Sequence, residues 1–241
     1  MNKERNIVND YNVDDGNVGK VDGVGNDVVF QTDVTSDSIP YGSRVLINGD
    51  LIMVTDLTVS NLVVKGNIKS YNEEGYDLTV EQSVECNGNL FARNLTAKVV
   101  EANKLSITGK IVAEKLSCTN KIRATNLEVT RELSCEEAIF IENNADLTAQ
   151  TYCKALCVKG YLYLDLGESN LFCELCCTVY GDLYCSGTLI AQKAIRVHRG
   201  TYVYGKIESE NITLSEAKIV GQLSAKNIKA ENIQFEGSIN H

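Results

Sequence analysis

The chain has 241 residues, of which 44% are hydrophobic, and it contains 18 glycines, one proline and no tryptophan. Its formal net charge of −9 argues against general nucleic-acid binding, because phosphate contacts require concentrated lysine and arginine. No apolar run approaches the length of a membrane span, and residues 1–15 contain no apolar signal region. We therefore expect a cytoplasmic protein without an integral membrane span.

Residues 1–40 differ in composition from the remainder of the chain. They are rich in Asp, Asn and Gly, which favours an acidic, partly disordered extension or cap. Residues 21–34 alternate enough to form one irregular strand. Pro40 then marks the boundary of a repetitive domain that is predicted to span 41–241.

Large aliphatic residues in this domain return every five or six positions, most regularly between Leu105 and Ile141. The anchors in that stretch are Leu105, Ile111, Leu116, Ile122, Leu127, Leu133 and Ile139. A second apolar or small residue follows each anchor after two positions, so each pair can face a core from one short strand. An amphipathic helix would need a period of three to four. The pattern predicts an all-β fold, a single-stranded β-helix or β-solenoid, in which each coil stacks on its neighbours.

Glycine spacing leaves two coil sizes open. Gly49 and Gly66 are 17 residues apart, and the glycines at 205, 221 and 237 are 16 apart, which suits three sides and about 16–17 residues per coil. Gly66, Gly88 and Gly109 are 22 and 21 apart, which suits four sides. We prefer three sides. The repeat is interrupted at 71–77, 142–146 and 165–178.

Four short motifs carry a family resemblance. They are Val64-Lys-Gly-Asn-Ile68, Val179-Tyr-Gly-Asp-Leu183, Val203-Tyr-Gly-Lys-Ile207 and Ile219-Val-Gly-Gln-Leu223. With the Ala or Cys positions that follow, they resemble the repeats of bactofilins, the polymer-forming cytoskeletal proteins of bacteria, over roughly residues 45–241. The resemblance implies a right-handed, three-sided β-helix that polymerises end to end without nucleotide. A weaker resemblance, through sequences such as Asn-Ala-Asp-Leu147, is to pentapeptide-repeat proteins.

Residues capable of catalysis or metal binding are few. His198 alternates with inward Ile195 and Val197 and has no acid beside it, so we expect an exposed structural histidine. The cysteines at 153, 157, 173, 176, 177 and 185 are the best metal candidates, yet Cys118 and Cys135 occupy positions that alanine fills elsewhere. We therefore expect buried thiols, no metal site, no cofactor and no enzymatic activity, with a carbohydrate-active β-helix as the enzyme alternative.

Two features point to partners. Outward tyrosines flank three glycines, and if those segments stack they form a ladder on one face; they are Tyr161, Tyr163, Tyr180, Tyr184, Tyr202 and Tyr204. The last repeats, with Phe235 and Ile239, contain no polar cap. We expect a structural scaffold that self-associates through this end as a dimer or filament. The alternative is a monomeric or dimeric binding module that uses the tyrosine face for a protein or glycan.

Overall fold

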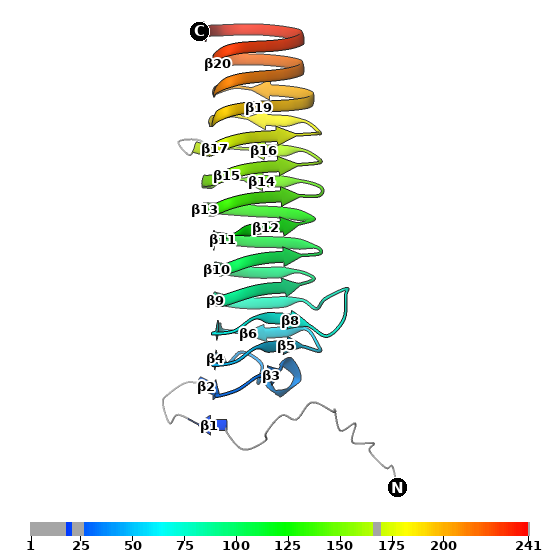
Figure 1. The fold of residues 1–241 in the computed structure, drawn as a ribbon, viewed down its shortest axis with the longest axis vertical. Coiled ribbons are helices and arrows are strands. Elements are labelled where there is room, and N and C mark those ends of the chain that lie inside the picture. Colours follow the sequence, from blue (N-terminus) through cyan, green and yellow to red (C-terminus); the bar gives the residue numbers. More distant parts are fainter. Residues whose placement is uncertain (1–17, 21–26, 166–169, 241) are drawn as a thin grey trace.

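The computed structural model describes residues 18–20, 27–165 and 170–240, which form one column of stacked coils (Figure 1). The column is a β-solenoid of about 11 turns, and its coils pair in parallel. The described residues contain no α-helix and one short 3-10 helix, Ser36–Ser38. The predicted all-β solenoid is confirmed.

Short strands build the first coils, and longer ones that run through the corners build the later coils. The first set is β1 (Val18–Lys20), β2 (Asp27–Phe30), β3 (Val34–Thr35), β4 (Arg44–Ile47), β5 (Leu51–Met53), β6 (Leu57–Val59), β7 (Asn61–Val64) and β8 (Ile68–Ser70). The second set is β9 (Leu78–Ala92), β10 (Leu95–Ile107), β11 (Lys110–Cys118), β12 (Lys121–Ala124), β13 (Asn126–Ile141), β14 (Ala145–Leu147), β15 (Gln150–Val158), β16 (Leu162–Leu164), β17 (Asn170–Val179), β18 (Leu183–Cys185), β19 (Thr188–Val203) and β20 (Lys206–Asn240).

Each coil has three sides. Every side pairs with the same side of the next coil, as in the partners Leu95–Ile111, Val100–Leu116 and Leu105–Ile122. We call the sides that contain Leu95, Val100 and Leu105 sides 1, 2 and 3. The glycines that suggested four sides belong to different corners, because the Gly88 amide bonds to the Gly66 carbonyl whereas the Gly109 amide bonds to the Arg93 carbonyl.

Two insertions enlarge individual coils. Residues 71–77 form a loop that projects from the column between β8 and β9 (Figure 1). The second insertion precedes β17, where residues 166–169 lie outside the described part. The prediction of irregularity at 142–146 and through 178 was too broad. Ala145 pairs in register with Leu127, and Asn170–Val179 is a continuous strand whose only irregularity against β15 is a register shift between Cys173 and Cys176.

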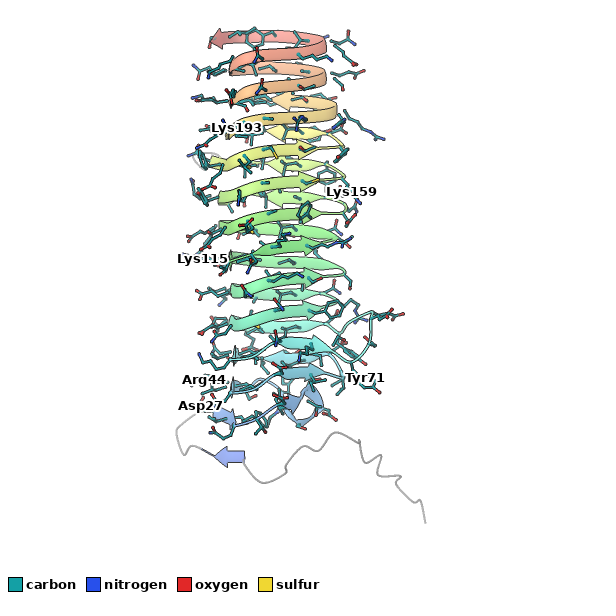
Figure 2. The ribbon with its side chains drawn as sticks, viewed as in Figure 1. Asp27, Arg44, Tyr71, Lys115, Lys159 and Lys193 are labelled. Atoms are coloured by element: carbon teal, nitrogen blue, oxygen red, sulfur yellow. The ribbon has the colours of Figure 1, made fainter. Side chains whose placement is uncertain are left out.

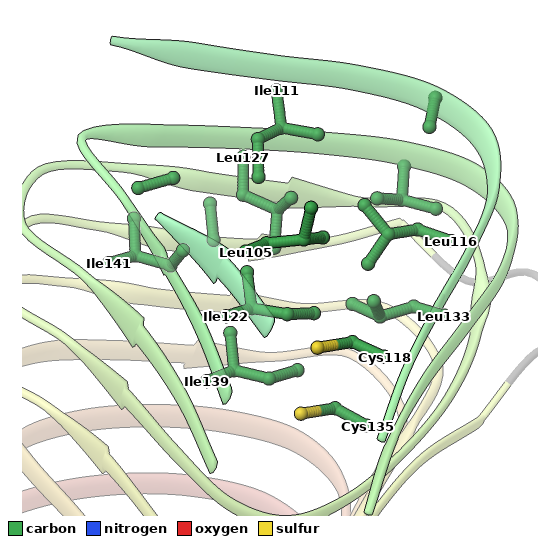
Figure 3. Packing of buried hydrophobic residues seen from close by; sticks show 14 of the residues in the cluster. Leu105, Ile111, Leu116, Cys118, Ile122, Leu127, Leu133, Cys135, Ile139 and Ile141 are labelled. Atoms are coloured by element: carbon green, nitrogen blue, oxygen red, sulfur yellow. The ribbon is translucent and has the colours of Figure 1, made fainter. Parts of the chain in front are cut away.

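Inward side chains form continuous columns through the solenoid. Figure 3 shows Leu105, Ile122 and Ile139 above one another on side 3, and each is almost completely buried. Burial of one such side chain contributes about 1.5–3 kcal/mol before the cost of ordering the chain. The core therefore needs many stacked coils, which explains why the repeat continues for so long.

One corner of the N-terminal coils is held by a ladder of acid and amide side chains. The Asp50 carboxylate accepts the Asn67 amide N–H at 2.6 Å, and the Asn67 side chain accepts the Asn89 N–H at 3.0 Å. Gly88 belongs to this corner, where an added Cβ would lie 2.7 Å from the Gly66 carbonyl oxygen. Glycine is required there because the backbones approach too closely for a side chain.

The parallel ladder begins earlier than the boundary at 41. Val28 of β2 pairs with Val45 of β4, so the first coil lies within the segment expected to be an extension or cap. β1 runs antiparallel beside β2, with Val18 opposite Phe30. The rest of the expected extension, residues 1–17 and 21–26, lies outside the described residues.

Polar side chains project from all sides of the column (Figure 2). Many ion pairs join neighbouring coils, as between Lys115 and Glu132 at 3.0 Å and between Lys154 and Glu137 at 3.2 Å. Each such exposed pair contributes about 0–1 kcal/mol. Within the described segments, no helix is long and apolar enough to cross a membrane.

Candidate functional site

Three of the predicted tyrosines form a ladder on side 1. Tyr163, Tyr184 and Tyr202 are register partners on successive coils. The rings of Tyr184 and Tyr202 stack with centroids 5.0 Å apart and planes within 8°, whereas Tyr163 is tilted by 45° at 6.3 Å from Tyr184. We call these three residues the tyrosine ladder. It places stacked rings, each partly open to solvent, along the column axis.

The other three predicted tyrosines lie outside this ladder. The ring of Tyr180 stacks on His198 at 4.7 Å with planes within 8°. Tyr161 lies at the corner before side 1, where its backbone N–H donates to the Asn144 side chain at 3.0 Å. Tyr204 is exposed at the end of β19. The six tyrosines therefore divide among different positions around the column and do not form one ladder.

A second aromatic stack lies on side 2 and was not predicted. Tyr152 and Phe172 are register partners whose rings stack at 5.6 Å, with planes within 9°. The Tyr152 hydroxyl donates to the Glu174 carboxylate, and this hydrogen bond raises the pKa of Tyr152. Thr151 and Cys153 face inward, so the alternation of inward and outward residues predicts that Tyr152, which lies between them, faces outward. Tyr152 does not flank a glycine, unlike the predicted tyrosines, so that signal does not indicate it.

Cations gather beside the aromatic residues. Arg196 and His198 are exposed on β19, as predicted from their alternation with inward residues. Arg196, Arg199 and Lys218 have no ion pair with any described residue, in contrast to Lys193, which pairs with Glu210 at 3.4 Å. Among the described residues, no group of three or more His, Cys, Asp or Glu side chains is arranged to hold a metal ion.

Most cysteines are core residues, as expected. Cys118 and Cys135 are neighbours in one inward column (Figure 3), and each thiol lies 3.3 Å from the corner carbonyl of the preceding coil, Asn103 or Asn120. A thiol at these two positions can therefore bond to a backbone carbonyl, which alanine cannot do. Burial raises the pKa of Cys185 to about 12, which makes the thiolate scarce. Only Cys157 and Cys176 are partly exposed.

The coil that contains residues 226–240 leaves its inward side chains partly uncovered in the structure. Gly237 stacks on Gly221 at the corner before side 2, so Ile239 occupies the column position of Leu223 one coil below. Leu223 is 0% exposed, whereas Ile239 is 43% exposed and Ile233 40%. Phe235 packs against the core but remains partly open. The two predicted end residues therefore belong to one apolar surface, which we call the C-terminal coil, residues 226–240.

Comparisons of the chain with protein-family models, with curated proteins and with solved structures gave no match.

Proposed function

We propose that the protein is a non-enzymatic, bactofilin-like structural scaffold that self-associates through its C-terminal coil. The observation that carries this proposal is the exposure of Ile233 and Ile239 in column positions whose occupants in the preceding coil, Ala217 and Leu223, are buried. Covering such side chains with apolar surface is favourable, by about 25 cal/mol per Å². The occupant that we propose is the same coil of a second copy.

The shape of this surface favours a second copy. Two copies of an apolar, three-sided end have matching dimensions. If they meet around a two-fold axis, the assembly is complete with two copies. Charges of both signs, Lys229, Glu231 and Glu236, surround it, so two copies do not meet a uniform field of like charge. The unpaired backbone groups of the last coil can also form hydrogen bonds across the contact.

The nine free cysteines fit a reducing compartment and support the proposed cytoplasmic location. The aromatic rings on β16 to β19 lie on earlier coils than the C-terminal coil. A contact through the C-terminal coil therefore leaves them free to bind a different partner. The scaffold proposal therefore does not depend on the tyrosines.

Sedimentation velocity over a range of concentrations tests the proposal. We expect a reversible dimer for the natural chain and a monomer for Phe235→Asp and Ile239→Asp, because a buried unpaired charge opposes the contact. Ser238→Asp is the matched control, since it adds the same charge on an exposed position of the same coil and is expected to retain the dimer.

Two results would overturn the proposal. One is a natural chain that stays monomeric at every concentration. The other is an assembly that survives both charged variants while their circular dichroism spectra stay unchanged. Electron microscopy of the same samples distinguishes a closed dimer from a filament.

A further inference from the structure

A groove of about 540 Å³ lies on side 1, directly beyond the last ring of the tyrosine ladder. It crosses three successive coils, and the lining residues used below are Tyr202, Glu216, Lys218, Asn232, Ile233 and Gln234. It is a hollow in the outer surface that reaches the C-terminal coil at residues 232–234, whereas Ile239 does not line it. Tyr202 contributes the only aromatic ring among its lining residues.

The Tyr202 ring is held in place on two sides. Tyr184 stacks on it at 5.0 Å, and Gly200 lies so close that an added Cβ would be 3.0 Å from Tyr202 Cε2. A ring fixed in this way loses little conformational entropy when a ligand packs on it. The ladder thus presents a rigid aromatic platform at the base of the groove.

The polar residues of the groove have unused hydrogen-bonding capacity. The side chains of Glu216, Lys218, Asn232 and Gln234 make no hydrogen bond or ion pair with any described residue. Polar side chains in the same coils behave differently, because Lys226 pairs with Glu210 at 3.4 Å. A carboxylate, an ammonium and two amides together supply several donors and several acceptors to one ligand.

This combination matches the chemistry of a neutral sugar. A pyranose has apolar C–H faces, which pack on aromatic rings, and a rim of hydroxyls, each of which donates and accepts hydrogen bonds. We propose that the groove binds a short neutral oligosaccharide, with one sugar face on the Tyr202 ring and its hydroxyls bonded to the surrounding polar side chains.

Other classes of ligand fit less well. Single-stranded nucleic acid needs an excess of cations, and here Lys218 is balanced by Glu216. A peptide that adds a strand needs a free sheet edge, whereas at Tyr202 and Lys218 this groove lies on the outer face of strands whose backbones pair with each other. A peptide that inserts an aromatic side chain remains as an outcome that the experiment distinguishes.

The experiment is a glycan array that contains neutral and acidic oligosaccharides, followed by isothermal titration with the neutral glycans that bind. We expect Tyr202→Ala and Asn232→Ala to weaken binding of those glycans by about tenfold or more. Tyr163→Ala, at the far end of the ladder, is the matched control and is expected to bind as the natural chain does. Circular dichroism checks that each variant is folded.

The Ile239→Asp variant separates this proposal from the scaffold proposal. We expect it to bind the same glycans whether or not it forms dimers, because Ile239 does not line the groove. The inference is overturned if no neutral glycan binds the natural chain, if only acidic glycans bind, or if Tyr202→Ala leaves the affinity unchanged. We expect that aromatic peptides do not displace the bound glycan. If they displace it efficiently, and if Asn232→Ala leaves the glycan affinity unchanged, the groove is a peptide site instead.

Discussion

The coils around residues 78–134 and those around 140–204 share one core and differ in their outer surface. In the first region the outward positions hold Lys, Glu, Ser and Thr, with ion pairs such as Lys110–Glu128 at 2.5 Å. In the second region they hold stacked aromatic rings, on side 1 at Tyr184 and on side 2 at Phe172. The inward columns pass from one region to the next without a break. Outer chemistry therefore changes along the column while the core continues unchanged in character.

The largest expected effect concerns the shared core. Leu127→Ala and Leu183→Ala remove buried side chains of the same side 1 column, one in each region, and each should lower the free energy of unfolding by about 2–5 kcal/mol. Urea denaturation of both variants measures this loss, with the outward variant Glu128→Ala as a control that removes one exposed ion pair and should cost at most about 1 kcal/mol. A much smaller loss for Leu183→Ala would mean that the aromatic surface, and not the core, stabilises the second region.

An intermediate effect is expected in the outer surface of the second region. Tyr184→Ala removes ring contacts to both Tyr163 and Tyr202, at a cost of about 1–2 kcal/mol. Lys115→Ala in the first region removes one exposed ion pair and should cost at most about 1 kcal/mol. Urea denaturation in low and high salt distinguishes the two losses of stability, because salt screens the ion pair and leaves the ring stacking intact. Equal salt dependence would contradict the comparison.

The smallest expected effect is a dependence of folding stability on pH, which arises from Asp77 at the start of the first region. Hydrogen bonds from Arg93 Nε at 2.8 Å and from the Asn94 side chain lower the pKa of Asp77. Because the folded state favours the carboxylate, this stabilisation is complete above the unfolded pKa of about 3.9 and is lost as pH falls through the lower folded value. Since the Asp77 side chain is 37% exposed and solvent screens its interactions, the change is below about 1 kcal/mol.

Denaturation of the natural chain and of Asp77→Asn between about pH 6 and pH 2 checks this expectation. The stability difference between them should shrink as the pH falls. Asp37→Asn, at an exposed position without an ion pair among the described residues, is the matched control and should show no such convergence. A difference that grows toward low pH would contradict the assigned hydrogen bonds.

The columns of the core could be predicted from the sequence because the spacing of anchors such as Leu105 and Ile122 is a local property. The register between coils could not be predicted throughout, since the insertions at 71–77 and before β17 change the distance between partners. For this reason the spacing from Gly88 to Gly109 suggested a fourth side although they lie at different corners.

The candidate site was predicted only in part for a similar reason. Inward and outward residues alternate around Tyr184, so the sequence predicted that its side chain faces outward. The ladder forms because Tyr163 and Tyr184 occupy the same position on successive coils. Tyr180 also faces outward, but the residue level with it on the next coil is His198, so its ring stacks on the imidazole and not on another tyrosine. The groove beyond Tyr202 depends on three coils at once, and no local pattern indicates it.

The central claim, that a second copy covers the C-terminal coil, is tested most directly by hydrogen–deuterium exchange at two protein concentrations. The account predicts that amides of residues 226–240 exchange slowly at high concentration and quickly on dilution, and quickly at both concentrations in Ile239→Asp. Amides of the coils between Leu105 and Ile141 should stay protected throughout. Equal exchange of residues 226–240 at both concentrations, in a sample that sediments as a dimer, would place the contact elsewhere.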